Sequence, residues 1–130
     1  MNYRECAEWL KNHDKILIIT HLRPDGDTLG SAAALCSALR RSGKQAAMFN
    51  NPEITEKYRK YVSEYICDDF DYDCTVAVDV ADKHMICAGF DGDINLCLDH
   101  HPTNSGYADN LLLEEASAST ADIIYFLLGE

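Results

Sequence analysis

Three groups of acidic and imidazole side chains stand out because each follows directly on an apolar run. They span His21 to Asp27, Asp79 to Asp82, and Asp99 to His101. Carboxylates gathered in one place repel one another, and their pKa values rise unless cations neutralise them. Imidazole and carboxylate ligands without a thiolate favour manganese, with zinc, cobalt and magnesium as alternatives. The sequence therefore predicts a metal site, provided that the fold brings the three groups together.

The apolar runs before these groups predict strands. Residues 15–20, 74–79 and 94–99 are short and mainly apolar, as in strands buried on both faces of a parallel sheet. Two further strands are expected at 45–49 and 111–113. Ligands bind such sheets outside the carboxyl ends of the strands. We therefore expect the three polar groups to meet at one edge of the sheet.

Helical patterns alternate with the strands, at residues 3–12, 29–42, 53–66 and 120–128. The last of them is preceded by a serine that resembles the start of a capping box. This alternation predicts the α/β class, with an open, mainly parallel sheet and helices on both faces. At 130 residues the chain fits one domain.

The charge is distributed unevenly along the chain. The net charge is -11, but residues 1–61 carry ten basic against seven acidic side chains, and residues 62–130 carry one against fifteen. An acidic surface disfavours the non-specific polyanion binding that basic domains show. A nucleotide substrate would therefore need bound cations, or a further segment of protein, to attract it.

Apolar runs and cysteine spacing indicate the compartment. No run approaches the roughly 20 apolar residues that a membrane span needs, and the N-terminus lacks a signal-peptide pattern. The six cysteines form no C-x-x-C pair and several lie in apolar stretches. We expect reduced, mostly buried thiols in a cytoplasmic protein without a membrane partner.

Three sequence motifs carry a resemblance to a known family. Residues 21–31 read HLRPDGDTLGS, residues 78–82 read VDVAD, and residues 99–104 read DHHPTN. In this order they resemble the first two motifs and the naming signature of the DHH phosphoesterases. The resemblance runs from about residue 15 to residue 128.

The resemblance implies a ligand set for two divalent metal ions. His21 and Asp25 would hold one ion, Asp27 and His100 would hold the other, and Asp79 would bridge them. Two ions roughly 3.5–4 Å apart can clamp a phosphoryl group and activate a water. Manganese is the expected metal, because the set contains imidazole and carboxylate groups only.

The signature motif also implies roles beside the metal ions. His101 would contact the substrate phosphate and assist proton transfer, so that it joins Asp79 and His100 as a catalytic residue. Asp99 would orient His100 through a hydrogen bond, the usual support of an imidazole ligand.

Substrate contacts are expected around the first motif. Gly30 and Ser31 would begin a helix whose free amide groups favour an anion. Arg23 is assigned to the substrate phosphate, with a surface position as the alternative. Asp82 is left open between a helix cap and a neighbour of the metal ions.

A phosphatase of the haloacid-dehalogenase type is the competing interpretation of residues 25–28. That class needs threonine or valine where this chain has Leu29, and it leaves the histidine pair unexplained. We therefore favour the DHH resemblance.

Within the family, residues 99–104, 107–109 and 117–122 are most similar to a group that degrades short nucleotides. The resemblance implies hydrolysis of short oligoribonucleotides, of 3'-phosphoadenosine 5'-phosphate, or of both. A cyclic dinucleotide phosphodiesterase and a manganese pyrophosphatase are the alternatives within the family. An inactive metal-binding fragment is the alternative outside it.

The family pattern also contains a fourth aspartate motif and a C-terminal substrate-binding domain, neither of which matches these residues. The resemblance implies that residues 1–130 are the N-terminal part of a DHH domain whose sheet is incomplete at its C-terminal end. A homodimer of the longer protein is left open.

Overall fold

The fold is built on one parallel sheet. The computed structural model describes all 130 residues. Its five strands lie in the order β2-β1-β3-β4-β5, and every neighbouring pair is parallel. Their bounds are β1 Ile16–Ile19, β2 Ala46–Met48, β3 Cys74–Val78, β4 Leu96–Asp99 and β5 Asn110–Leu113. The predicted α/β class and the open parallel sheet are confirmed.

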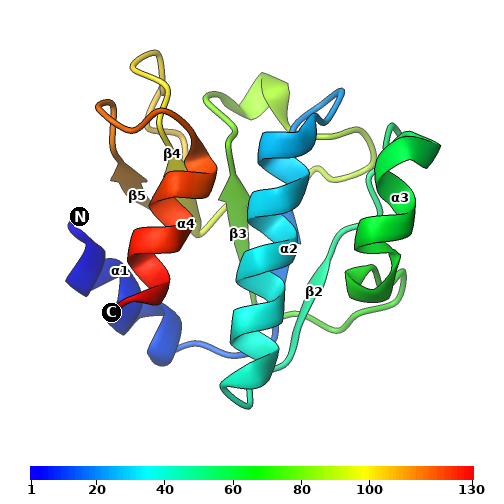
Figure 1. Cartoon of the computed structure of the whole chain (residues 1–130), viewed down its shortest axis with the longest axis horizontal. Coiled ribbons are helices and arrows are strands. Elements are labelled where there is room, and N and C mark those ends of the chain that lie inside the picture. The colour runs from blue at the N-terminus through cyan, green and yellow to red at the C-terminus, as the bar shows by residue number, and fades with distance from the viewer.

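One face of the sheet is covered by α-helices. Figure 1 shows α2 and α4 side by side across this face, with α1 beside the lower end of α4 and α3 on the other side of α2. The main core of 23 buried residues lies between the strands and these helices. The helix bounds are α1 Tyr3–Lys11, α2 Gly26–Arg41, α3 Glu56–Val62 and α4 Thr120–Leu128.

The second face is covered mainly by loops. Eight buried residues form its core, among them Leu17 and Ile19, which alternate with the β1 side chains that face the helices. In the strand order β2-β1-β3-β4-β5, the step from β1 to β2 runs toward one side of the sheet. The steps from β3 to β4 and from β4 to β5 run toward the other side. Right-handed crossovers therefore place these connections on the second face. The only helical turn among them is η2, Lys83–Met85, so the expected helices on both faces are reduced there to one 3-10 turn.

Two predicted helices differ from the structure by more than one residue at an end, whereas α1 ends one residue before the predicted 3–12. The helix expected at 29–42 begins three residues earlier, because the Asp25 carboxylate caps it by accepting from the Thr28 amide at 3.1 Å. The helix expected at 53–66 is shortened to α3 and a following 3-10 turn, η1, Ser63–Tyr65. The last helix has the predicted bounds, and Ser119 caps it by accepting from the Asp122 amide.

All six cysteines are free thiols and five are buried, as expected. None of the helices has the length and apolar character needed to cross a bilayer.

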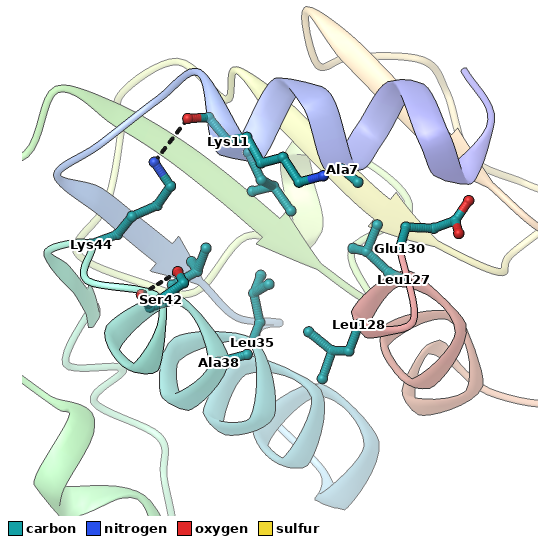
Figure 2. Close-up of a pocket in the computed structure, with 11 residues that line it drawn as sticks. Ala7, Lys11, Leu35, Ala38, Ser42, Lys44, Leu127, Leu128 and Glu130 are labelled. Atoms are coloured by element: carbon teal, nitrogen blue, oxygen red, sulfur yellow. Dashed lines mark hydrogen bonds between the residues drawn. The ribbon is translucent and has the colours of Figure 1, made fainter.

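An apolar pocket lies between α1, α2 and α4, at the amino-end edge of the sheet (Figure 2). Its volume is about 230 Å³, and Leu35, Leu127 and Leu128 are among its lining residues. Lys44 closes one side, and its Nζ donates to the Lys11 carbonyl oxygen at 3.0 Å. The pocket contains no histidine or aspartate, and the predicted polar groups lie at the other edge.

Candidate metal centre

The three polar groups follow strands that are direct neighbours. β1, β3 and β4 are adjacent in the sheet, and β1 pairs with β3 in register from Ile16 with Cys74 to Ile19 with Ala77. The groups therefore emerge at the same carboxyl edge, as the sequence predicted. Figure 1 shows the first turns of α2 and α4 at this edge as well.

At the centre of this edge lie Asp79, His100 and His101, whose ligand atoms are all within 4.8 Å of one another. Asp79 Oδ1 is 3.5 Å from His100 Nε2 and 3.8 Å from His101 Nδ1. Asp27 joins from α2, because its Oδ2 lies 3.9 Å from the same His100 Nε2. Two carboxylates and one imidazole nitrogen thus converge from α2 and from the ends of β3 and β4.

Asp79 occupies an unfavourable environment for a carboxylate. It is 5% exposed, and its backbone is left-handed with φ 64°, which is uncommon outside glycine. Burial and the nearby charge of Asp27 raise the pKa of Asp79 to about 6, against the opposing effect of a Thr120 hydrogen bond. A divalent cation would offset both causes. The donor set therefore fits a metal ion chemically.

Asp27 makes contacts that the sequence did not reveal. Its Oδ2 accepts from the Thr120 amide at 3.1 Å, and its Oδ1 accepts from the Ala121 amide at 3.0 Å. The Ser31 hydroxyl lies 3.5 Å from Oδ1. Asp27 therefore satisfies the free amides at the start of α4, which is 93 residues away in sequence. Thr120 was predicted to begin a helix, but only the tertiary structure shows its carboxylate partner.

His21 and Asp25 lie at the same edge but outside the group within 4.8 Å. His21 Nδ1 contacts the Leu22 carbonyl oxygen, and its amide donates to Thr28 Oγ1 at 3.3 Å. Thr28 Oγ1 in turn donates to the Val78 carbonyl oxygen at 2.9 Å. The first motif is thus tied to β3 directly before Asp79, while the Asp25 carboxylate caps α2.

The expected bond between Asp99 and His100 is wrong. Asp99 is fully buried, and its Oδ1 pairs with His101 Nδ1 at 2.7 Å. Its Oδ2 accepts from Asn104 Nδ2 at 2.9 Å. Successive side chains of extended backbone point to opposite sides, so residue 99 shares a side with residue 101. This alternation was available in the sequence.

His100 is oriented by a different partner. Its Nδ1 lies 3.3 Å from the Ser117 carbonyl oxygen, which can only accept a hydrogen bond. With Nδ1 as the donor, Nε2 keeps its lone pair and faces Asp27 and Asp79. This contact favours the tautomer in which Nε2 can bind a metal ion.

Gly30 and Ser31 do not begin a helix. Because α2 starts at Gly26, they lie one turn inside it, where backbone amides bond to preceding carbonyl groups. The predicted anion site at these two amides is therefore wrong. Ser31 is instead fully buried beside Asp27.

Arg23 and Asp82 have partners outside the group of Asp79, His100 and His101. The Arg23 side chain is exposed, and its amide lies 3.4 Å from Glu53 Oε1. Asp82 caps η2 by accepting from the His84 amide at 2.9 Å, which fulfils the helix-cap alternative.

Comparisons with known proteins agree with this architecture. The profile of the DHH family, N-terminal domain, matches residues 15–130. The chain is 26% identical over 130 residues to the bifunctional oligoribonuclease and PAP phosphatase NrnA of Bacillus subtilis, covering 97% of this chain and 42% of that protein. It is 30% identical over 129 residues to the Thermus thermophilus protein of the same name, covering 96% and 40%.

A solved structure supports the fold alone. An exopolyphosphatase-related protein from Bacteroides fragilis superimposes with a TM-score of 0.69 at 20% identity, covering 98% of this chain and 42% of that chain. The chain thus spans about two-fifths of the length of each of these proteins. With the family's N-terminal profile matched over residues 15–130, this chain belongs to the DHH family.

Proposed function

We propose that the chain is the N-terminal part of a metal-dependent phosphoric ester hydrolase that cleaves short oligoribonucleotides, 3'-phosphoadenosine 5'-phosphate, or both. The observation that carries the proposal is the convergence of Asp27, Asp79 and His100 at the carboxyl edge of the sheet. The substrate class rests on the relatives, which are named as oligoribonucleases and PAP phosphatases.

The proposed metal ligands fall into two sets. Asp27, Asp79 and His100 would hold one divalent ion through Oδ2, Oδ1 and Nε2, the atoms that face one another. His21 and Asp25 would hold a second ion together with Asp79, and a turn of their loop would have to bring them closer. The chemistry that two such ions supply is stabilisation of phosphoryl charge and activation of a water, with manganese favoured.

His101 is proposed to contact the phosphate and to transfer a proton. The buried Asp99 carboxylate holds its Nδ1, so the second ring nitrogen remains available to the substrate. The His101 side chain is 39% exposed, which lets a ligand reach it. A carboxylate that fixes one imidazole nitrogen and leaves the other for proton transfer is a recurring catalytic arrangement.

The test uses the full-length gene product that contains these 130 residues. It is incubated with Mn²⁺ and either a short oligoribonucleotide or 3'-phosphoadenosine 5'-phosphate, and mononucleotide and phosphate are quantified. Release that requires Mn²⁺ and is lost in Asp79→Asn supports the proposal. No Mn²⁺-dependent release from either substrate contradicts it, and cyclic dinucleotides and pyrophosphate then test the family alternatives.

A metal-binding fragment without turnover is the second candidate. It is favoured by the strongly acidic residues 62–130, which would repel a nucleotide. The 130-residue chain would then bind Mn²⁺ but hydrolyse substrate far more slowly than the full-length product. Equal rates would exclude this candidate.

A further inference from the structure

Thr120 connects two carboxylates that come from different elements. Its backbone amide donates to Asp27 Oδ2 at 3.1 Å, and its hydroxyl donates to Asp79 Oδ1 at 3.0 Å. Asp27 lies in the first turn of α2, and Asp79 follows β3. A single residue of α4 thereby sets where both carboxylates lie.

The two carboxylates need such a connection because like charges repel at short range. Thr120 is fully buried, so no water can readily replace its hydroxyl. Its own position is fixed by the rest of α4, where Ile123, Ile124 and Leu127 are at most 3% exposed in the main core. Core packing of the helix is therefore transmitted to the carboxylates.

The hydrogen bonds from α4 leave room for a cation. A carboxylate oxygen has two acceptor sites. Asp27 Oδ2 uses one for the Thr120 amide, and Asp79 Oδ1 uses one for the Thr120 hydroxyl. His100 Nε2 lies 3.9 Å and 3.5 Å from these same two oxygens. The helix thus holds two carboxylate oxygens that both lie near the imidazole nitrogen and that each keep one free acceptor site.

We propose that Thr120 is a positioning residue of the metal centre, whose hydroxyl and amide hold Asp79 and Asp27 in the arrangement that binds a divalent cation. The inference rests on the proposed function, because it takes Asp27 and Asp79 as metal ligands. Thr120 itself contacts neither the cation nor the substrate.

The experiment compares three variants by calorimetric titration with Mn²⁺ and by the electron paramagnetic resonance spectrum of the bound ion. Thr120→Val keeps the shape and the amide but removes the hydroxyl, whereas Thr120→Ser keeps both donors. Thr75→Val is the matched control, because Thr75 is 2% exposed and its hydroxyl donates to the Asp93 carbonyl oxygen near the amino end of β3. Circular dichroism checks that each variant is folded.

We expect Thr120→Val to weaken Mn²⁺ binding about tenfold or more, the usual cost of losing a partner of a metal ligand, and to change the resonance spectrum. Thr120→Ser and Thr75→Val should bind as the unsubstituted protein does. If Thr120→Val binds Mn²⁺ as tightly as the unsubstituted protein, or if Thr75→Val weakens binding equally, Thr120 has no positioning role. If the unsubstituted protein binds no Mn²⁺, the proposed function falls and this inference falls with it.

Discussion

The two edges of the sheet differ in chemistry, although the same helices reach both. At the carboxyl edge, buried Asp79 and Asp99 lie with half-buried histidines and the first turns of α2 and α4. At the amino edge, the ends of α1, α2 and α4 enclose an apolar pocket of about 230 Å³ (Figure 2). This apolar pocket thus lies where the chain offers no histidine or aspartate side chain. In this protein the donor atoms, and not the size of the cavity, identify the site.

Asp79→Ala, at the carboxyl edge, should have the largest effect on activity and on metal binding. It removes the carboxylate proposed to bridge the metal ions. Such ions stabilise the charge of the transition state by several kcal/mol. We expect kcat/KM to fall about a thousandfold and Mn²⁺ stoichiometry to drop in calorimetry. Lys44→Ala, at the amino edge, is the control and should keep both values. An Asp79→Ala protein that still binds two ions would contradict the bridging role.

Leu35→Ala tests the opposite edge. Leu35 is fully buried and lines the apolar pocket, so its truncation should cost about 2–4 kcal/mol of unfolding free energy, measured by denaturant titration. Mn²⁺ affinity under native conditions should be unchanged, because no proposed ligand contacts this side chain. A parallel loss of affinity would show that the two edges are coupled.

Asp99→Asn should act through His101. The amide no longer carries the charge that fixes the imidazole, and we expect kcat to fall roughly 10–100-fold with little change in Mn²⁺ affinity. His100 is supported by the Ser117 carbonyl oxygen instead, which is why metal binding should persist. If Asp99→Asn chiefly weakens metal binding, the assignment of Asp99 to His101 is wrong.

The metal-free protein should show a pH effect centred on Asp79. Its pKa is raised to about 6 from 3.8, so its contribution to stability is present below pH 4 and is lost as the pH rises through 6. Asparagine carries no such charge. The unfolding free energy of metal-free Asp79→Asn, relative to that of the unsubstituted protein, should therefore be roughly 1–3 kcal/mol higher at pH 7 than at pH 4. Thermal melting at both pH values measures the gain, and added Mn²⁺ should reverse the order. Equal gains at both pH values would argue against an unfavourable charge at residue 79.

The strand ends were predictable because they depend on local sequence. Short apolar runs followed by polar groups predicted three strands whose polar side chains meet at one edge. The family motifs then indicated which of these side chains are the metal ligands. The start of α2 was misplaced because Asp25 was interpreted only as a ligand, although its type and position also suit a helix cap. The pairing of Asp99 with His101 follows from strand alternation and could have been predicted.

The link between Asp27 and α4 could not have been predicted from local patterns. It joins residues 93 and 94 positions apart, through backbone amides that carry no side-chain signature. Likewise, aspartate is one of the residues that tolerate a left-handed backbone, but nothing in the local sequence distinguishes Asp79 from the other aspartates in this respect. The contacts of Asp27 with α4 arise from packing α4 against α2, which the sequence alone did not specify.

The central claim is that Asp27, Asp79 and His100 hold a divalent cation. The most direct measurement is anomalous X-ray diffraction from crystals grown with Mn²⁺, recorded on both sides of the manganese absorption edge. We predict an anomalous peak bounded by Asp27 Oδ2, Asp79 Oδ1 and His100 Nε2. A crystal that contains Mn²⁺ only elsewhere, with no peak between these three atoms, would contradict the claim.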